Sequence, residues 1–160
     1  MDCVIQKATS SKNDGSKGRP ISFDRAAVID QAVELFWMNG FDGASLDDLV
    51  SGLGISRSTL YNSFGGKDGL HQSATASYLD RVERVIIEPL RTGTGGLTDL
   101  TIFIEAVELV LTSPDMPAGC LVLNDMASPR NAAAVDRYLT GLDGAIHAAL
   151  SRAAALNQID

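Results

Sequence analysis

A dense run of hydrogen-bonding side chains lies between Ser56 and Lys67, and no carboxylate interrupts it. Because Leu60 and Phe64 stand four residues apart, a helix through this stretch turns both inward and leaves the polar side chains facing out. Guanidinium, hydroxyl and amide groups are the donors and acceptors that meet base edges and phosphate oxygens in DNA. The run therefore predicts a nucleic-acid contact made by Arg57, Ser58, Thr59, Tyr61, Asn62 and Ser63.

The residues before this run predict the element that holds it in place. Ser45 is suited to cap a short helix whose apolar face consists of Leu46, Leu49, Val50 and Leu53. Gly54 then suits the left-handed position beyond a helix end, and Ser56 suits the cap of the next helix. Two helices joined by such a turn form a helix-turn-helix, whose second helix enters the major groove.

Several short segments carry a closer likeness: Gly54-Ile55-Ser56, Thr59-Leu60-Tyr61, Phe64 and Lys67-Asp68-Gly69-Leu70. Together they closely resemble the DNA-binding domain of the TetR/AcrR family of transcriptional regulators. The resemblance extends upstream over residues 23–45, which look like that family's first helix and its connection. Downstream, residues 117–124 resemble a Gly-Cys-Leu segment found in part of the family.

The resemblance implies a role for each polar residue of the helix-turn-helix. Arg57 is expected to read a base, because its guanidinium fork pairs bidentately with O6 and N7 of guanine. Ser58, Thr59 and Asn62 are expected at bases or phosphates, and Tyr61, Ser63 and Lys67 at the DNA backbone. Ser45 offers a phosphate its hydroxyl or its helix N-terminus. The alternative for each residue is a polar surface on a small helical bundle.

The resemblance also implies a second, helical domain that binds a small-molecule effector and forms a homodimer. The residues expected to line its pocket are Phe103, Val107, Val110 and Leu121. The helix that starts at Lys67 would then carry the motion between two positions. Family members usually continue into two further helices that pair across the two-fold axis. The chain ends before them, so we expect a dimer through another surface or a truncated member with reduced operator affinity.

The remaining sequence predicts an all-α fold with three parts. Residues 1–21 are expected to be a disordered tail, whose cations either touch flanking DNA or stay solvated. Residues 22–68 form the three-helix DNA-binding domain, and residues 69–160 the helical regulatory domain. Helices are expected over 24–39, 67–91, 97–113 and 129–156, with a short apolar element at 119–126. The helix over 97–113 is so apolar that we expect it at the centre of its layer.

The negative net charge of the chain disfavours a general electrostatic attraction to DNA. The chain has 13 Lys and Arg against 20 Asp and Glu, a formal charge of −7. In residues 1–71, seven basic and nine acidic residues leave −2, so the expected DNA-binding half lacks a broad basic surface. A duplex would be held by a few placed donors, with weak binding to DNA of arbitrary sequence.

Other function classes find less support in the sequence. Cys3 and Cys120 are the only cysteines, and neither a zinc site nor a cofactor is indicated. His71 and His147 have no ligand spacing, so the prediction is a regulator and not an enzyme. No apolar run approaches a membrane span, and we expect a cytoplasmic protein. The alternative is a truncated ligand- or partner-binding protein without independent operator binding.

Overall fold

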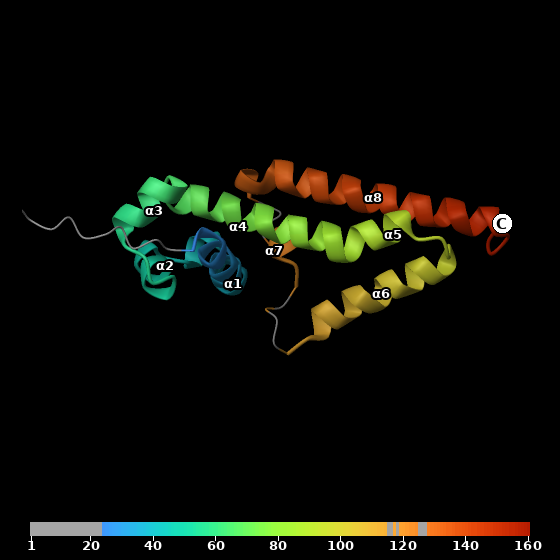
Figure 1. Ribbon diagram of the computed structural model, residues 1–160, viewed down its shortest axis with the longest axis horizontal. Helices are drawn as coiled ribbons and strands as arrows, with labels where there is room; N and C mark the ends of the chain where they lie inside the picture. The colour runs from blue at the N-terminus through green and yellow to red at the C-terminus, as the bar shows by residue number, and fades with distance from the viewer. Residues whose placement is uncertain (1–23, 115–116, 118, 125–127) are drawn as a thin grey trace, which may run out of the picture.

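The computed structural model describes residues 24–114, 117, 119–124 and 128–160, and all regular structure within these ranges is helical. The predicted tail over residues 1–21 and the end of the short apolar element, residues 125–126, lie outside the described ranges. The predicted all-α class is confirmed (Figure 1).

Three helices form the N-terminal unit: α1 (Arg25–Gly43), α2 (Leu46–Gly52) and α3 (Arg57–Phe64). Asp24 caps α1 by accepting from the backbone N–H of Ala26 at 2.9 Å. The predicted stop at Gly40 is a kink, because Gly40 has φ 68° and one further turn continues to Gly43. Only glycine takes that conformation without steric cost.

The core of this unit is assembled from the predicted apolar faces. Leu49 of α2 and Leu60 of α3 are fully buried, and Phe36 of α1 is 1% exposed. The same cluster continues into the C-terminal half through Leu121 and Val122, so the two halves share one apolar core.

A long helical rod leads away from α3. It consists of α4 (Lys67–Val82), a π-helical turn η1 (Glu83–Ile87) and α5 (Glu88–Thr92), so the predicted helix over 67–91 is confirmed (Figure 1). In the π-helical turn the backbone N–H of Glu88 donates to Glu83, five residues back. Pro89 has no N–H to give to the carbonyl four residues earlier, and this favours an irregular turn beside it.

The later helices lie along this rod. They are α6 (Leu97–Thr112), α7 (Leu121–Asn124), the 3₁₀ turn η2 (Pro129–Asn131) and α8 (Ala132–Ala155). In Figure 1, α8 runs beside most of the rod and continues past its far end, while α6 returns below it. A second core cluster joins rod and α8 through Ile87, Leu90, Ala145 and Ala149. No described helix is long and apolar enough to cross a membrane.

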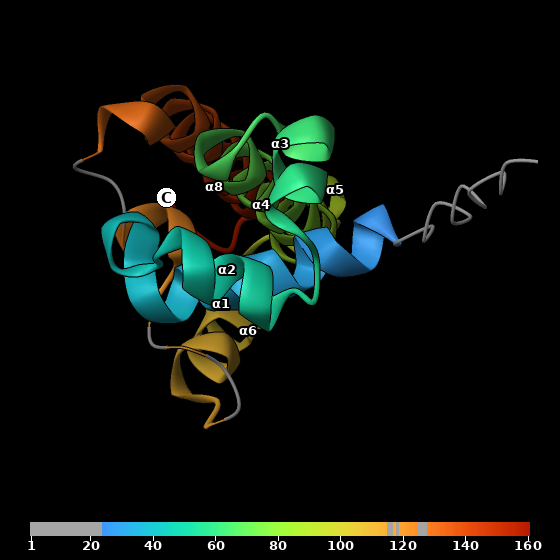
Figure 2. The ribbon, with the colours of Figure 1, turned by 90° about the vertical axis from the view of Figure 1, so that its left-hand side faces the viewer.

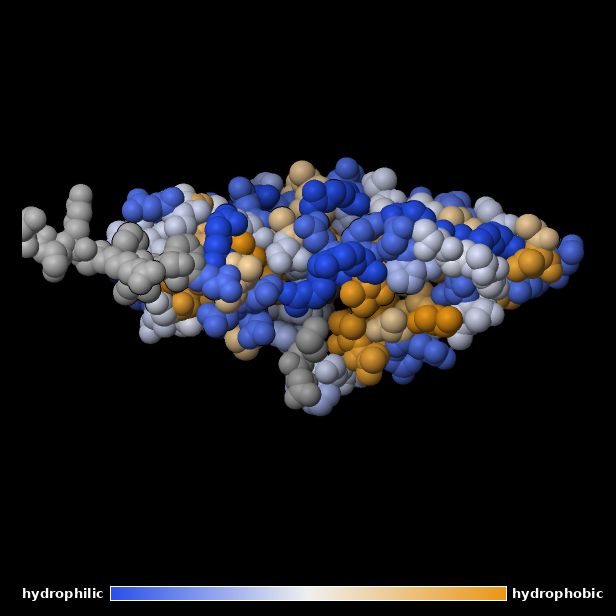
Figure 3. All heavy atoms as spheres, in the orientation of Figure 1, coloured by the Kyte–Doolittle hydropathy of each residue, from blue (hydrophilic) through white to orange (hydrophobic). Residues whose placement is uncertain are grey.

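The expectation that residues 97–113 lie at the centre of their layer is wrong. No residue of α6 is buried, and Leu109 is 71% exposed. One face of α6, with Leu100 and Phe103, packs on the second cluster, whereas the opposite face has no described neighbour. Apolar side chains accordingly gather on the surface over α6 in Figure 3. Leu139 and Leu150 of the last helix are exposed as well.

Candidate DNA-binding interface and effector groove

Two capped helix starts fix the geometry of the helix-turn-helix. At the start of α2, Ser45 and Asp48 form a capping box, in which the Ser45 Oγ accepts from the Asp48 N–H at 3.1 Å. Gly54 follows α2 with φ +62°, the left-handed conformation the sequence predicted there. Ser56 then caps α3 by accepting from the Thr59 N–H at 3.0 Å.

α3 turns one side to the core and the other to solvent. Leu60 and Phe64 are buried, whereas Arg57, Ser58, Tyr61 and Asn62 are exposed and Thr59 and Ser63 are half-buried. The structure thus brings the predicted contact residues of α3 onto one continuous surface. Figure 2 looks onto this end of the molecule, with α3 and α2 toward the viewer.

Arg57 has an acidic partner that the sequence analysis missed. Its guanidinium forms an ion pair with Asp47 of α2, and both side chains are more than half exposed. An exposed pair of this kind contributes roughly 0–1 kcal/mol. The cost of releasing the Arg57 guanidinium from Asp47 is therefore small. The ten-residue spacing across a turn leaves no local periodic signal for this pair.

Hydroxyl groups cluster at the N-terminus of α3. The Ser56 Oγ lies 2.8 Å from the Ser58 Oγ and 2.9 Å from the Thr59 Oγ1. A hydroxyl both donates and accepts, so each of these groups keeps further hydrogen-bonding capacity. The cluster lies beside the backbone N–H groups of the helix N-terminus, where a phosphate oxygen is favoured.

Tyr61 and Lys67 flank the corner between α3 and α4. Tyr61 is 56% exposed, and its ring lies against Gly66, where a Cβ would come within 3.1 Å of Cε1. Lys67 places its ammonium 4.4 Å from the ring centroid of Phe41, a cation–π contact. Tyr61 is thus exposed and Lys67 half-buried beside the start of α4.

Arg130 is a further cation at this end, and the sequence analysis did not single it out. Its guanidinium lies 4.2 Å from the centroid of the same Phe41 ring, and Nε is 3.4 Å from Asp68 Oδ1. It belongs to η2, far along the chain from α1 and α4, so only the tertiary structure reveals the contact.

An apolar groove lies where α1, the rod, α6 and the residues before α7 meet. Its cavity volume is about 170 Å³, and its lining includes Trp37, Val107, Val110, Cys120 and Tyr138. Val107 and Val110, which the sequence predicted to line an effector pocket, both line this groove. Phe103 packs in the second core cluster instead, and Leu121 is buried in the first, so neither lines this groove.

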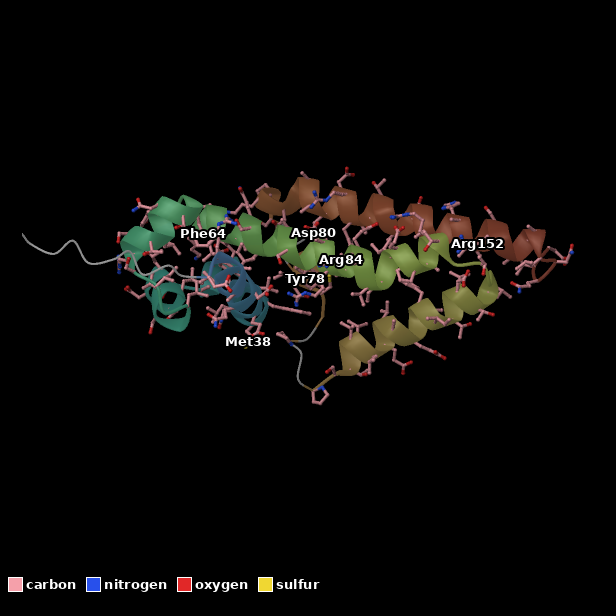
Figure 4. All side chains as sticks on the ribbon, viewed as in Figure 1. Met38, Phe64, Tyr78, Asp80, Arg84 and Arg152 are labelled. Atoms are coloured by element: carbon pink, nitrogen blue, oxygen red, sulfur yellow. The ribbon has the colours of Figure 1, made fainter. Side chains whose placement is uncertain are left out.

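Tyr78 supplies one polar group to the groove. Its hydroxyl donates to the Cys120 sulfur at 3.3 Å, and Figure 4 shows Tyr78 on α4. Burial, with the Cys120 hydrogen bond as the second cause, raises the pKa of Tyr78 well above its ordinary value of 10.0. The phenol therefore stays neutral at a pH where an ordinary tyrosine ionises, and its hydroxyl remains a donor to Cys120.

Comparison with known proteins finds similar bacterial regulators both by sequence and by structure. Residues 28–74 match the family described as "Bacterial regulatory proteins, tetR family". The transcriptional repressor ComR of Escherichia coli is 37% identical over 114 residues, which are 69% of this chain and 53% of ComR. The uncharacterized regulator YezE of Bacillus subtilis is 34% identical over 142 residues, 85% of this chain and 73% of YezE.

Solved structures of a TetR family transcriptional regulator, CifR, share the fold. One, a cysteine mutant complexed with 26 bp double-strand operator DNA, has a TM-score of 0.67 and 29% identity over 84% of this chain and 71% of that chain. Another reaches a TM-score of 0.71 with 28% identity, over 88% of this chain and 76% of that chain. This chain spans about half the length of ComR but almost three quarters of YezE. With the capped helix-turn-helix already described, these matches show that the chain belongs to the tetR family of bacterial regulatory proteins.

Proposed function

We propose that this chain is a DNA-binding transcriptional repressor that acts as a homodimer on a two-fold symmetric operator. The outward face of α3 carries this proposal, because it joins a guanidinium, hydroxyls and an amide on a capped helix with no carboxylate among residues 57–64. The repressor ComR and the operator-bound CifR are similar proteins, and this supports the same role here. Two half-sites one helical turn apart would match the two-fold axis of the dimer.

The contacts that we assign to DNA are the predicted ones. Arg57 reads a guanine in the major groove, with Ser58, Thr59 and Asn62 at neighbouring bases or phosphates. Tyr61, Ser63, Lys67 and Ser45 hold the backbone. Because the whole chain carries a formal charge of −7, affinity for arbitrary duplexes is low and the operator must supply the discrimination.

Selection from a random duplex library, followed by titration of wild type and Arg57→Ala on the selected site, tests this function. Removing a bidentate guanine contact is expected to cost about 1–3 kcal/mol and to relax preference at one base pair. Arg84→Ala, an exposed arginine on the rod, is the matched control and should leave both unchanged. Equal affinity and equal base preference in Arg57→Ala would remove Arg57 from the readout.

The regulatory half, residues 69–160, is proposed to bind a small apolar or amphipathic effector in the groove beside Tyr78. The groove is walled by the rod that begins at Lys67, so its occupant bears directly on the helix next to the DNA-binding surface. Trp37 lines the groove and is the single tryptophan of the chain, so its fluorescence reports occupancy without a label. A true effector would change this fluorescence and release the operator at the same concentration.

Sedimentation at low micromolar concentration, with and without a duplex bearing the selected site, tests the dimer. We expect two chains per duplex in the complex. A single chain per duplex would contradict the homodimer and leave recognition to one half-site. We place the protein in the cytoplasm, where its operator lies, and we propose no catalytic activity for it.

A further inference from the structure

Phe41 is shared by cations from both halves of the molecule. It lies in the last turn of α1 in the DNA-binding unit, and its side chain is buried against Phe36 and His71, whose ring centroids lie 6.2 and 5.0 Å from its own. Lys67 approaches the ring from α4, and Arg130 approaches it from η2 in the regulatory half. A ring held on this apolar side is a fixed platform for both cations.

Arg130 has a second contact at the same place. Its Nε lies 3.4 Å from the carboxylate of Asp68, the residue next to Lys67. The Asp68 side chain is 71% exposed, so the carboxylate faces solvent on the side of the molecule where the start of α4 meets DNA in our proposal. The Arg130 guanidinium therefore contacts both the Phe41 ring, over which Lys67 lies, and the carboxylate of Asp68, the neighbour of Lys67 in the chain.

In this arrangement the Lys67 ammonium is available to pair with an anion. Among the described residues, Lys67 forms no ion pair, and its ammonium lies over the Phe41 ring. Asp68 is the carboxylate nearest to it in the chain, and Arg130 occupies that carboxylate. Without Arg130, Asp68 would attract the Lys67 ammonium and would also repel a phosphate brought to the start of α4.

We propose that Arg130 is a positioning residue for DNA binding: by pairing with Asp68 and stacking on Phe41, it reserves the Lys67 ammonium for a phosphate. This inference rests on the proposed function, since it presumes that Lys67 contacts DNA. It gives the regulatory half a specific point of contact with the DNA-binding surface. Movement of η2 would then alter DNA affinity without touching α3.

The DNA test compares four variants on the selected duplex. Arg130→Gln is expected to lose roughly three- to tenfold in affinity at low salt, and Arg130→Lys, which keeps a charge for Asp68, should lose less. Asp68→Asn should equal or exceed wild type. The double variant Arg130→Gln with Asp68→Asn should recover most of the loss, because the competing carboxylate is gone. A double variant as weak as Arg130→Gln would overturn the proposal and point to a direct phosphate contact by Arg130.

Arg137→Gln is the matched control for lost positive charge. Arg137 is exposed two helical turns further into α8 and forms no ion pair with the described residues. We expect it to keep wild-type affinity within about twofold. A loss equal to that of Arg130→Gln would mean that net charge, and not the position of Arg130, matters.

A readout without DNA separates this inference from the proposed function. Because the Lys67 Nζ lies over the Phe41 ring, the protons on the adjoining Cε should show an upfield ring-current shift in the NMR spectrum of the free protein. Arg130→Gln should reduce the shift as Lys67 turns to Asp68, and Asp68→Asn in the same chain should restore it. An unchanged shift in Arg130→Gln would overturn the positioning role. Failure of the wild type to bind any duplex, with these shifts as expected, would overturn the proposed function and the DNA-binding role of Arg130 with it, and would leave only the positioning of Lys67 by Arg130 standing.

Discussion

At the scale of single residues, burial decides how a side chain behaves, and Tyr78 is the clearest case. It is 6% exposed, lies with its ring centroid 5.1 Å from that of Trp37, and donates its hydroxyl to Cys120. Burial is the largest cause of its raised pKa, and the Cys120 bond is the second. Tyr138, half-buried nearby, has its pKa raised by burial as well. The folded state therefore favours the neutral form of both phenols.

We predict that Tyr78 makes the folded state lose stability at alkaline pH. A phenol in the unfolded chain releases its proton near pH 10, whereas the folded protein keeps it, so the unfolded state binds fewer protons above that pH. The free energy of unfolding should fall as pH rises from 10. Urea titrations at pH 8, 10 and 11 would show a smaller fall in Tyr78→Phe. A fall of the same size in that variant would assign the loss to other groups.

At the scale of elements, the corner between α3 and α4 depends on a close backbone approach. Gly69 lies in the first turn of α4, and a Cβ at that position would stand 1.7 Å from the carbonyl oxygen of Phe64. No rotation of a side chain relieves that clash, because the obstructing atom is backbone. Gly65 and Gly66, with φ of 78° and 107°, make the tight turn that brings the two helices this close.

We predict that Gly69→Ala destabilises the fold by about 1–3 kcal/mol or more, because α4 must move away from α3. Its displacement would also shift Lys67, so DNA affinity should fall along with stability. Gly144→Ala is the matched control, since a Cβ there meets nothing within 4 Å in the middle of α8. It should stabilise the protein by about 0.5–1 kcal/mol. Equal midpoints of urea unfolding for both variants would contradict the close approach at Gly69.

At the scale of the whole molecule, one arginine fixes the far end of α8 to the rod. Arg152 donates to the backbone carbonyls of Leu90 and Arg91, the latter at 2.9 Å, and pairs with Asp99 at 3.1 Å. Asp99 in turn accepts from the N–H groups of Gly95 and Gly96 at 3.0 Å. Figure 4 shows Arg152 where α8 passes α5. The side chains of Arg152 and Asp99 are 23% and 12% exposed, so solvent screens this pair less than the surface pairs.

We predict that Arg152→Met lowers the free energy of unfolding by about 2–3 kcal/mol, because Asp99 and two carbonyls lose a charged donor. Arg84→Met, which removes an exposed donor to the Asp80 carbonyl at 3.2 Å, should cost less than about 0.5 kcal/mol. Chemical denaturation of both variants measures the difference. Equal losses would show that the junction of α8 with the rod contributes no special stability.

Much of the fold could be predicted from local sequence. The caps at Ser45 and Ser56 and the left-handed turn at Gly54 depend on residues within four positions of each other, and the structure contains all three. The polar side of α3 follows from the spacing of Leu60 and Phe64 alone. The extents of the rod and of α8 followed from apolar periodicity in the same way.

Other features were decided only by the tertiary structure, because they depend on what packs beside an element. The composition of α6 indicates an apolar helix but does not say whether a neighbour covers its second face, and in the described residues none does. The Asp47 partner of Arg57 and the Gly69 contact with Phe64 arise where two helices meet at a corner. Arg130 reaches Asp68 across more than sixty residues of chain. Periodicity acts within a helix, and so the sequence alone determined the helices and the polar side of α3, while packing determined which charges meet.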